Sequence, residues 1–275
     1  YLVFYLLFRS RLSIDKYLLK NKYNKIEKGY LHFVDAMIAV ANKDNKTALK
    51  SHKKMVTYLK DDPSLSLLLK SEVLKIEKKF PELNNVYEDM IKSKKTETLG
   101  YRGLMEQNLR NQDYHHAFLY GEKLFSINPN IEKLYDTLIF IAAKTKNWNQ
   151  IVLLSDKAFS HKIISKNDLN ENKSVGFYEI AKIKYDSDIK DSLKNILKAV
   201  DLKKNFPPYV KLHLEIIASL NNKRNLKKLI KKYWSFNPST LLRSIIIKIL
   251  NDNKLTDIKF INEIINNNAS EEESK

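Results

Sequence analysis

The sequence predicts an all-α fold, an α-solenoid of stacked helical hairpins wound into a right-handed superhelix. Apolar residues recur three and four positions apart along most of the chain, which is the spacing of amphipathic helices. Only five Gly and six Pro occur among 275 residues, so there is little material for the many tight turns of a sheet protein. An internal repeat is the third observation, and it indicates a helical array.

The repeat begins at residue 101. Four residues stand at the offsets of one tetratricopeptide repeat, and a degenerate second copy follows about 34 residues later. In this motif small residues let the two helices of a hairpin approach, while large residues fill the gap to the next hairpin. A generic helix pair with coincidental spacing is the alternative, but the Ala117 to Pro129 separation recurs from Leu226 to Pro238. The signature positions are Tyr101, Leu104, Ala117 and Pro129, then Tyr135, Leu138 and Ala158, and finally Pro238.

Polar breaks in the helical spacing place the remaining elements. The segments 111–113 and 146–149 are matched hinges inside the two repeat copies, because their side chains compete for backbone hydrogen bonds. The polar segment 160–173 predicts a longer connection, where binding loops often lie. Helices are expected at 31–41, 48–59, 64–76 and 83–91, with the turn of this last pair at Phe80–Pro81, and after the clear copies at 175–185, 189–200, 209–220, 226–236, 239–250 and 256–267.

The first residues have the pattern of the end of a membrane-spanning helix. Residues 1–8 are continuously apolar, and Arg9, Arg11 and a series of lysines follow them. A span needs about 20 apolar residues, so the rest is expected upstream; the positive-inside rule then keeps the following domain in the cytoplasm. A buried first helix is the alternative. We predict a transmembrane end at residues 1–12, a repeat domain at 13–268 and a disordered acidic tail at 269–275.

Charge restricts the classes of partner. The chain has 49 Lys and Arg against 32 Asp and Glu, a formal net charge of +17, which favours anionic lipid, nucleic acid or an acidic protein. The codon usage of an AT-rich genome also explains abundant lysine and asparagine, so nucleic-acid binding is a minor hypothesis. Because cysteine is absent, disulfides, thiolate metal sites and cysteine nucleophiles are excluded.

Residues with catalytic or ligand chemistry do not combine into a site, so neither an enzyme nor a metal site is predicted. His115 and His116 are adjacent, and adjacent side chains on a helix diverge too far to share one ion. Gly100 and Gly103 lack the lysine and hydroxyl of a phosphate-binding loop and are expected to allow close helix packing.

A partner-binding groove is the predicted functional surface. First helices of each hairpin line the inner face of such arrays. Arg102 faces away from Leu104 on the first helix of its hairpin. Lys144 and Lys146 lie at the end of the first helix of the next hairpin. These three cations are the candidate groove residues. Solvated surface charge is the alternative reading of all three.

The segment Glu97 to Leu104, which includes Leu-Gly-Tyr-Arg-Gly-Leu, and the run Lys231 to Pro238 resemble the HemY N-terminal family of proteobacterial proteins. The resemblance covers nearly the whole chain. It implies a bacterial inner-membrane protein with a cytoplasmic tetratricopeptide domain and an association with haem or tetrapyrrole synthesis. The flavin-dependent enzyme that shares this family's name is not what the chain resembles, because no glycine-rich dinucleotide fingerprint is present.

These observations lead to a membrane-anchored scaffold that binds a partner protein. The candidate partner is an enzyme of the haem pathway. No cofactor is predicted. Direct haem or porphyrin binding is one alternative function, and general envelope assembly is another.

Overall fold

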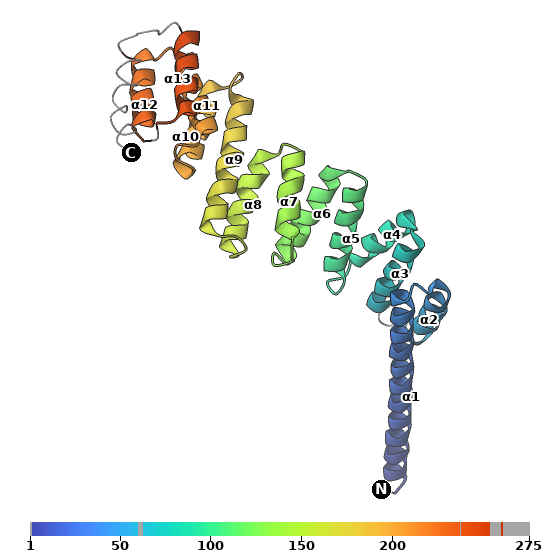
Figure 1. Cartoon of the computed structure of the whole chain (residues 1–275). Coiled ribbons are helices and arrows are strands. Elements are labelled where there is room, and N and C mark those ends of the chain that lie inside the picture. The colour runs from blue at the N-terminus through green and yellow to red at the C-terminus, as the bar shows by residue number, and fades with distance from the viewer. Residues whose placement is uncertain (1, 60–62, 237, 254–259, 261–275) are drawn as a thin grey trace, which may run out of the picture. The chain divides into compact units, whose positions relative to one another are not determined.

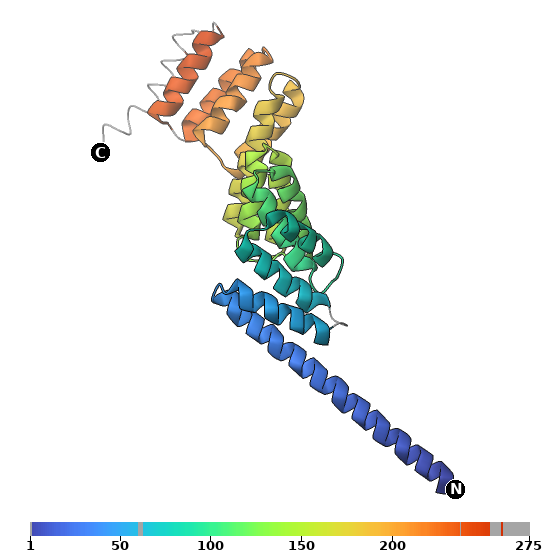
Figure 2. The same cartoon turned by 90° about the vertical axis from the view of Figure 1, so that its right-hand side faces the viewer.

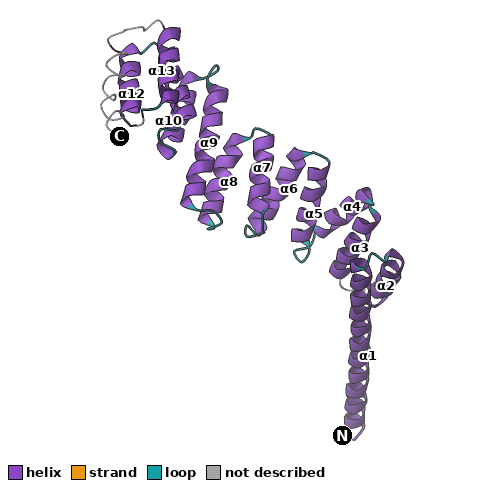
Figure 3. Cartoon of the chain, in the orientation of Figure 1, coloured by secondary structure: helices purple, strands orange, loops and turns teal. Residues whose placement is uncertain are grey.

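The computed structural model describes residues 2–59, 63–236, 238–253 and 260. In these ranges the chain forms thirteen α-helices and no strand (Figure 3). It divides into two compact units, Tyr1–Leu134 and Tyr135–Lys275, and each is described by itself. The predicted all-α fold is confirmed.

Unit 1 is a stack in which consecutive helices pack side by side (Figure 1). Its buried side chains form one cluster around Met55 and Leu69, shared by the first three helices, and a second around Leu83 and Met90, shared by the later ones. A separate cluster between each set of neighbours is what stacked hairpins produce, because each hairpin buries its apolar stripe on the next. The helices are α1 (Leu2–Ala41), α2 (Asn45–Tyr58), α3 (Pro63–Glu77), α4 (Phe80–Met90), α5 (Glu97–Arg110) and α6 (Tyr114–Ile127).

Unit 2 has the same organisation. One buried cluster surrounds Ile196 and Tyr209, and another surrounds Ile230 and Ile246, so neighbouring helices again share successive cores. The helices are α7 (Leu134–Lys144), α8 (Trp148–Ser160), α9 (Lys166–Lys184), α10 (Ile189–Leu202), α11 (Pro207–Ser219), α12 (Lys223–Phe236) and α13 (Thr240–Asp252). The right-handed winding of the whole chain stays a prediction.

The turns after α5 and α7 follow one design. After α5, Gln112 adopts a left-handed conformation with φ 59°, and the Asp113 N–H donates to the Asn108 carbonyl at 2.9 Å. After α7, Lys146 has φ 55° and the Asn147 N–H donates to the Ala142 carbonyl at 2.8 Å. This is the Schellman arrangement, which satisfies the last carbonyls of a helix and reverses the chain. It occurs at both of the predicted hinges.

Two predicted boundaries are wrong. The long connection at 160–173 is not found, because α9 begins at Lys166. Ser165 and Asp168 form a capping box there: the Ser165 N–H donates to Asp168 Oδ2 at 3.1 Å, and the Asp168 N–H donates to Ser165 Oγ at 3.2 Å. The turn predicted at Phe80–Pro81 also belongs to a helix, since proline fits the first turn of α4.

Helix α1 runs unbroken from Leu2 to Ala41, so the boundary predicted at residue 12 falls inside it. Among the described residues, no helix is both long enough and apolar enough to cross a membrane. The transmembrane end at residues 1–12 stays a prediction. The acidic tail predicted at 269–275 lies outside the described residues, as does the helix predicted at 256–267 apart from Phe260.

Candidate functional site

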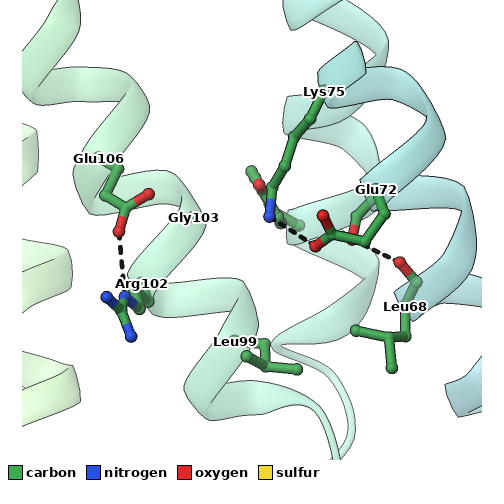
Figure 4. Close-up of a pocket in the computed structure, with 9 residues that line it drawn as sticks. Leu68, Glu72, Lys75, Leu99, Arg102, Gly103 and Glu106 are labelled. Atoms are coloured by element: carbon green, nitrogen blue, oxygen red, sulfur yellow. Dashed lines mark hydrogen bonds and ion pairs between the residues drawn. The ribbon is translucent and has the colours of Figure 1, made fainter. Parts of the chain in front are cut away.

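A pocket on one side of unit 1, where α3, α4 and α5 meet, is the strongest candidate for a binding site (Figure 4). Its volume is about 250 Å³. Apolar walls come from α3 and α5, and charged side chains from the same two helices stand around them. The lining residues are Leu68, Ser71, Glu72, Lys75, Tyr87, Leu99, Arg102, Gly103 and Glu106.

The ring of Tyr87 forms part of the pocket wall because α5 comes very close to α4. A Cβ atom added at Gly103 would overlap the Tyr87 ring, which is only 3% exposed. At Gly100 a Cβ would lie 2.7 Å from Ile91 Cγ2 and 2.8 Å from the Tyr87 carbonyl oxygen. Both glycines therefore allow close packing of α5 on α4, as the sequence predicted, and this approach places α5 near the charged face of α3.

Two ion pairs provide the charges of the pocket. On α3, Lys75 Nζ lies 2.7 Å from Glu72 Oε1, and on α5 Arg102 Nε lies 3.0 Å from Glu106 Oε1 (Figure 4). Both pairs are substantially exposed, so each contributes little to folding, about 0–1 kcal/mol. The pairs can exchange these contacts for charged or polar groups of a partner at small cost.

The protonation states of the pocket follow from its burial and hydrogen bonds. Burial of the Lys75 ammonium opposes its charge, but the hydrogen bond to Glu72 and the attraction of Tyr87 and Glu72 outweigh that effect, so its pKa is raised. Burial also raises the pKa of the Tyr87 hydroxyl. At neutral pH the pocket therefore presents a cationic Lys75 beside a neutral phenol.

The pocket lining can contact an apolar side chain together with charged or polar groups. Leu68 and Leu99 offer apolar contact, and Leu99 is 43% exposed at the rim. Two cations and two anions at the edge can pair with charged side chains on either side of an apolar one, or with the peptide backbone. Shape and charge together favour an apolar residue flanked by polar ones.

Of the three cations predicted from sequence, the structure places Arg102 in this pocket. Lys144 and Lys146 belong to unit 2. The Lys144 ammonium lies 5.6 Å from the centre of the Phe140 ring, and Lys146 occupies the turn after α7. A common groove for the three residues stays a prediction.

Most of the repeat signature positions on the helices are buried. Leu104, Ala117, Leu138 and Ala158 are at most 3% exposed, and Tyr101 is half-buried on α5. Tyr135 is buried, with its hydroxyl 3.0 Å from Ser155 Oγ and accepting from Asn172 Nδ2 at 2.9 Å, so one phenol links α7, α8 and α9. Pro129 lies in the turn after α6, and Pro238 lies between α12 and α13.

The sequence reasoning missed most of the pocket. Glu72 and Lys75 are three residues apart and Arg102 and Glu106 are four apart, so each ion pair was readable as a helical pair. No sequence pattern near either ion pair indicated that the two pairs would line the same pocket.

His116 takes part in the cap of α6. Asp113 caps α6 by accepting the His116 N–H at 3.1 Å, and its other oxygen lies 2.7 Å from His116 Nδ1. In the described part of the chain no three His, Asp or Glu side chains gather as metal ligands.

No family model and no curated protein matches this chain. Among solved structures, Naa15/Naa10 bound to HypK-THB is similar with 17% identity over 86% of this chain, at a TM-score of 0.49. The chain spans only 35% of the length of that structure's chain. PilF of Pseudomonas aeruginosa is similar with 11% identity over 83% of this chain and 99% of its own, at a TM-score of 0.39. YrrB, described as a TPR protein with an unusual peptide-binding site, is similar with 13% identity over 74% of this chain and 97% of its own, at a TM-score of 0.34. The resemblance to the HemY N-terminal family stays a prediction.

Proposed function

We propose that this chain is a scaffold of tetratricopeptide-like hairpins that holds a segment of a partner protein in the pocket of α3, α4 and α5. It is anchored in the bacterial inner membrane with its repeats in the cytoplasm, and its partner is an enzyme of haem or tetrapyrrole synthesis. The observation that carries the binding role is the open pocket in unit 1, where an exposed leucine lies between two exchangeable ion pairs. The anchor and the haem pathway are supported by the apolar start of the sequence and the family resemblance.

The size of the pocket favours a peptide over a porphyrin. Pockets that enclose small molecules and cofactors have volumes of roughly 300–1,000 Å³. The volume here, about 250 Å³, is enough for one or two side chains but not for a haem macrocycle.

Site-specific photo-crosslinking in native membranes tests the proposal. A photo-reactive residue replaces Leu99 in the full-length protein, and the captured protein is identified by mass spectrometry. We expect an enzyme of the tetrapyrrole pathway. Leu119 on α6 is the matched control position, because it is 45% exposed against 43% for Leu99 and does not line the pocket.

The same pair of residues tests affinity. Leu99→Glu places an unpaired charge at the apolar rim and should abolish co-purification of the captured partner, whereas Leu119→Glu should leave it unchanged. Equal effects of the two substitutions would refute a role for the pocket.

Capture of envelope-assembly proteins alone would exclude the haem pathway, and release of the protein from membranes by alkaline carbonate would exclude an integral anchor. A Soret shift on adding haem to the purified protein would favour direct haem binding instead.

A further inference from the structure

In the first part of α1 whose side chains are described, from Asp15 to Lys28, no side chain is covered by another helix. Every residue from Asp15 to Lys28 is exposed. Figure 2 shows this part of α1 extending away from α2, against which the C-terminal part of the helix packs. Large apolar side chains are nonetheless present: Leu19 is 67% exposed, Tyr23 69%, Ile26 36% and Tyr30 50%.

These four residues form one line along the helix, which we name the α1 stripe. Their separations are four, three and four residues. This is the spacing of the apolar a and d positions of a heptad repeat, which lie along one side of each helix in a coiled coil. Over the stripe α1 rises about 17 Å, at about 1.5 Å per residue. A helix this exposed gains little from packing within its own chain, and a continuous apolar line on it marks a contact surface.

We propose that the α1 stripe is the dimer contact of this protein, and that its occupant is the α1 stripe of a second copy in a parallel, in-register coiled coil. With Tyr23 and Tyr30 at the a positions, Leu19 and Ile26 occupy the d positions. The same register continues upstream in the sequence, where Leu12 and Tyr5 stand seven and fourteen residues before Leu19.

The charges beside the stripe identify a second copy as the occupant. In a parallel pair, each g position lies opposite the e position five residues further along the other helix. Asp15 then faces Lys20 of the second copy, and Lys22 faces Glu27. Both contacts join opposite charges, and two-fold symmetry makes each of them twice. The flanks of the stripe are thus complementary to themselves.

An anionic lipid surface is the competing occupant of the same stripe. Helices that lie on such membranes carry lysine and arginine on their polar face, and this segment carries Lys16, Lys20, Lys22, Lys25 and Lys28. Asp15 and Glu27, directly beside the stripe, would be repelled by anionic headgroups but attracted to the lysines of a second copy, and this favours the second copy.

Sedimentation velocity of the 275-residue chain tests the proposal, and a dimer is expected. Leu19→Asn should convert it to a monomer. Leu18→Asn is the matched control, because Leu18 is 57% exposed and adjacent in sequence but lies outside the stripe. Circular dichroism of both variants checks that they remain helical. A dimer that survives Leu19→Asn, or an equal loss with Leu18→Asn, would overturn the proposal.

Charge exchange tests the partner's identity. Lys22→Glu places two acidic residues opposite each other in both copies of the contact between positions 22 and 27, leaves the Asp15–Lys20 contacts unchanged, and should weaken the homodimer about tenfold. Glu27→Lys should do the same with two lysines. An equimolar mixture of these two variants should form a heterodimer, because each carries the charges that the other lacks. Failure of the mixture to associate would contradict the pairing.

Because the chain has no cysteine, one introduced thiol reports the alignment. Tyr23→Cys should form an intermolecular disulfide on mild oxidation, and Asn24→Cys, on the outer side, should not. A dimer without the Tyr23→Cys disulfide would exclude the parallel register.

A wild-type monomer at the highest soluble concentration would refute self-association, and its binding to phosphatidylglycerol vesicles would assign the stripe to lipid instead.

Discussion

Acidification should destabilise unit 2 through His213. This residue is on α11 and only 6% exposed, and its Nδ1 lies 2.7 Å from the Tyr233 hydroxyl on α12. Burial, and to a smaller extent the charge of Lys232, lowers the pKa of the His213 imidazole to about 4, although Asp201 opposes them. Burial also raises the pKa of Tyr233 to about 12, so the phenol keeps its proton. The folded protein therefore requires a neutral imidazole.

The size of the effect follows from the two pKa values. His213 has a pKa of 6.5 when exposed and about 4 in the folded protein, so only the unfolded chain gains a proton between these values. The stability that depends on neutral His213 is fully present above pH 6.5 and is lost as the pH falls towards 4. A pKa difference of one unit is equivalent to about 1.4 kcal/mol. The free energy of unfolding therefore falls by about 2 kcal/mol at pH 5 and by about 3 kcal/mol in total.

Urea unfolding followed by circular dichroism at pH 7.5 and pH 5 measures this loss. The control variant is His213→Gln, whose amide oxygen can accept the Tyr233 hydroxyl but does not titrate. The wild-type protein should lose about 2 kcal/mol more than this variant between the two pH values. Equal pH dependence of the two proteins would refute the reasoning, as would an NMR titration that shows His213 protonating near its ordinary pKa.

Three substitutions test the packing and the turns by thermal unfolding. Gly103→Ala should destabilise unit 1 by about 1–2 kcal/mol despite the better helix propensity of alanine, because its Cβ overlaps the buried Tyr87 ring; a stabilised variant would contradict this. Gln112→Gly should stabilise the protein by up to about 1 kcal/mol, since glycine adopts φ 59° without the Cβ penalty; a lower melting temperature would count against it. Tyr135→Phe should cost about 1–2 kcal/mol by leaving Ser155 and Asn172 without the phenol; an unchanged melting temperature would show that this link is dispensable.

Local chemistry explains why the fold was predictable. The turn after α5 could be recognised from Asn111, Gln112 and Asp113 because residues that cap and terminate helices act through backbone atoms a few positions away. The Ala117 to Pro129 spacing similarly reports a hairpin whose contacts repeat along the chain. The start of α9 was missed although it was equally local, since Ser165 and Asp168 stand at the three-residue spacing of a capping box.

The sequence by itself determined the helical hairpins, their hinges and the basic, cysteine-free composition, because each depends on residues close together in the chain. Only the tertiary structure decided that Lys75 and Arg102, on different helices, line one pocket. That meeting depends on how closely α5 approaches α4, which the buried contact of Gly103 with Tyr87 sets. Packing likewise decided which apolar residues of α1 are covered: Ala36 is buried against α2, whereas Leu19 and Tyr23 remain exposed.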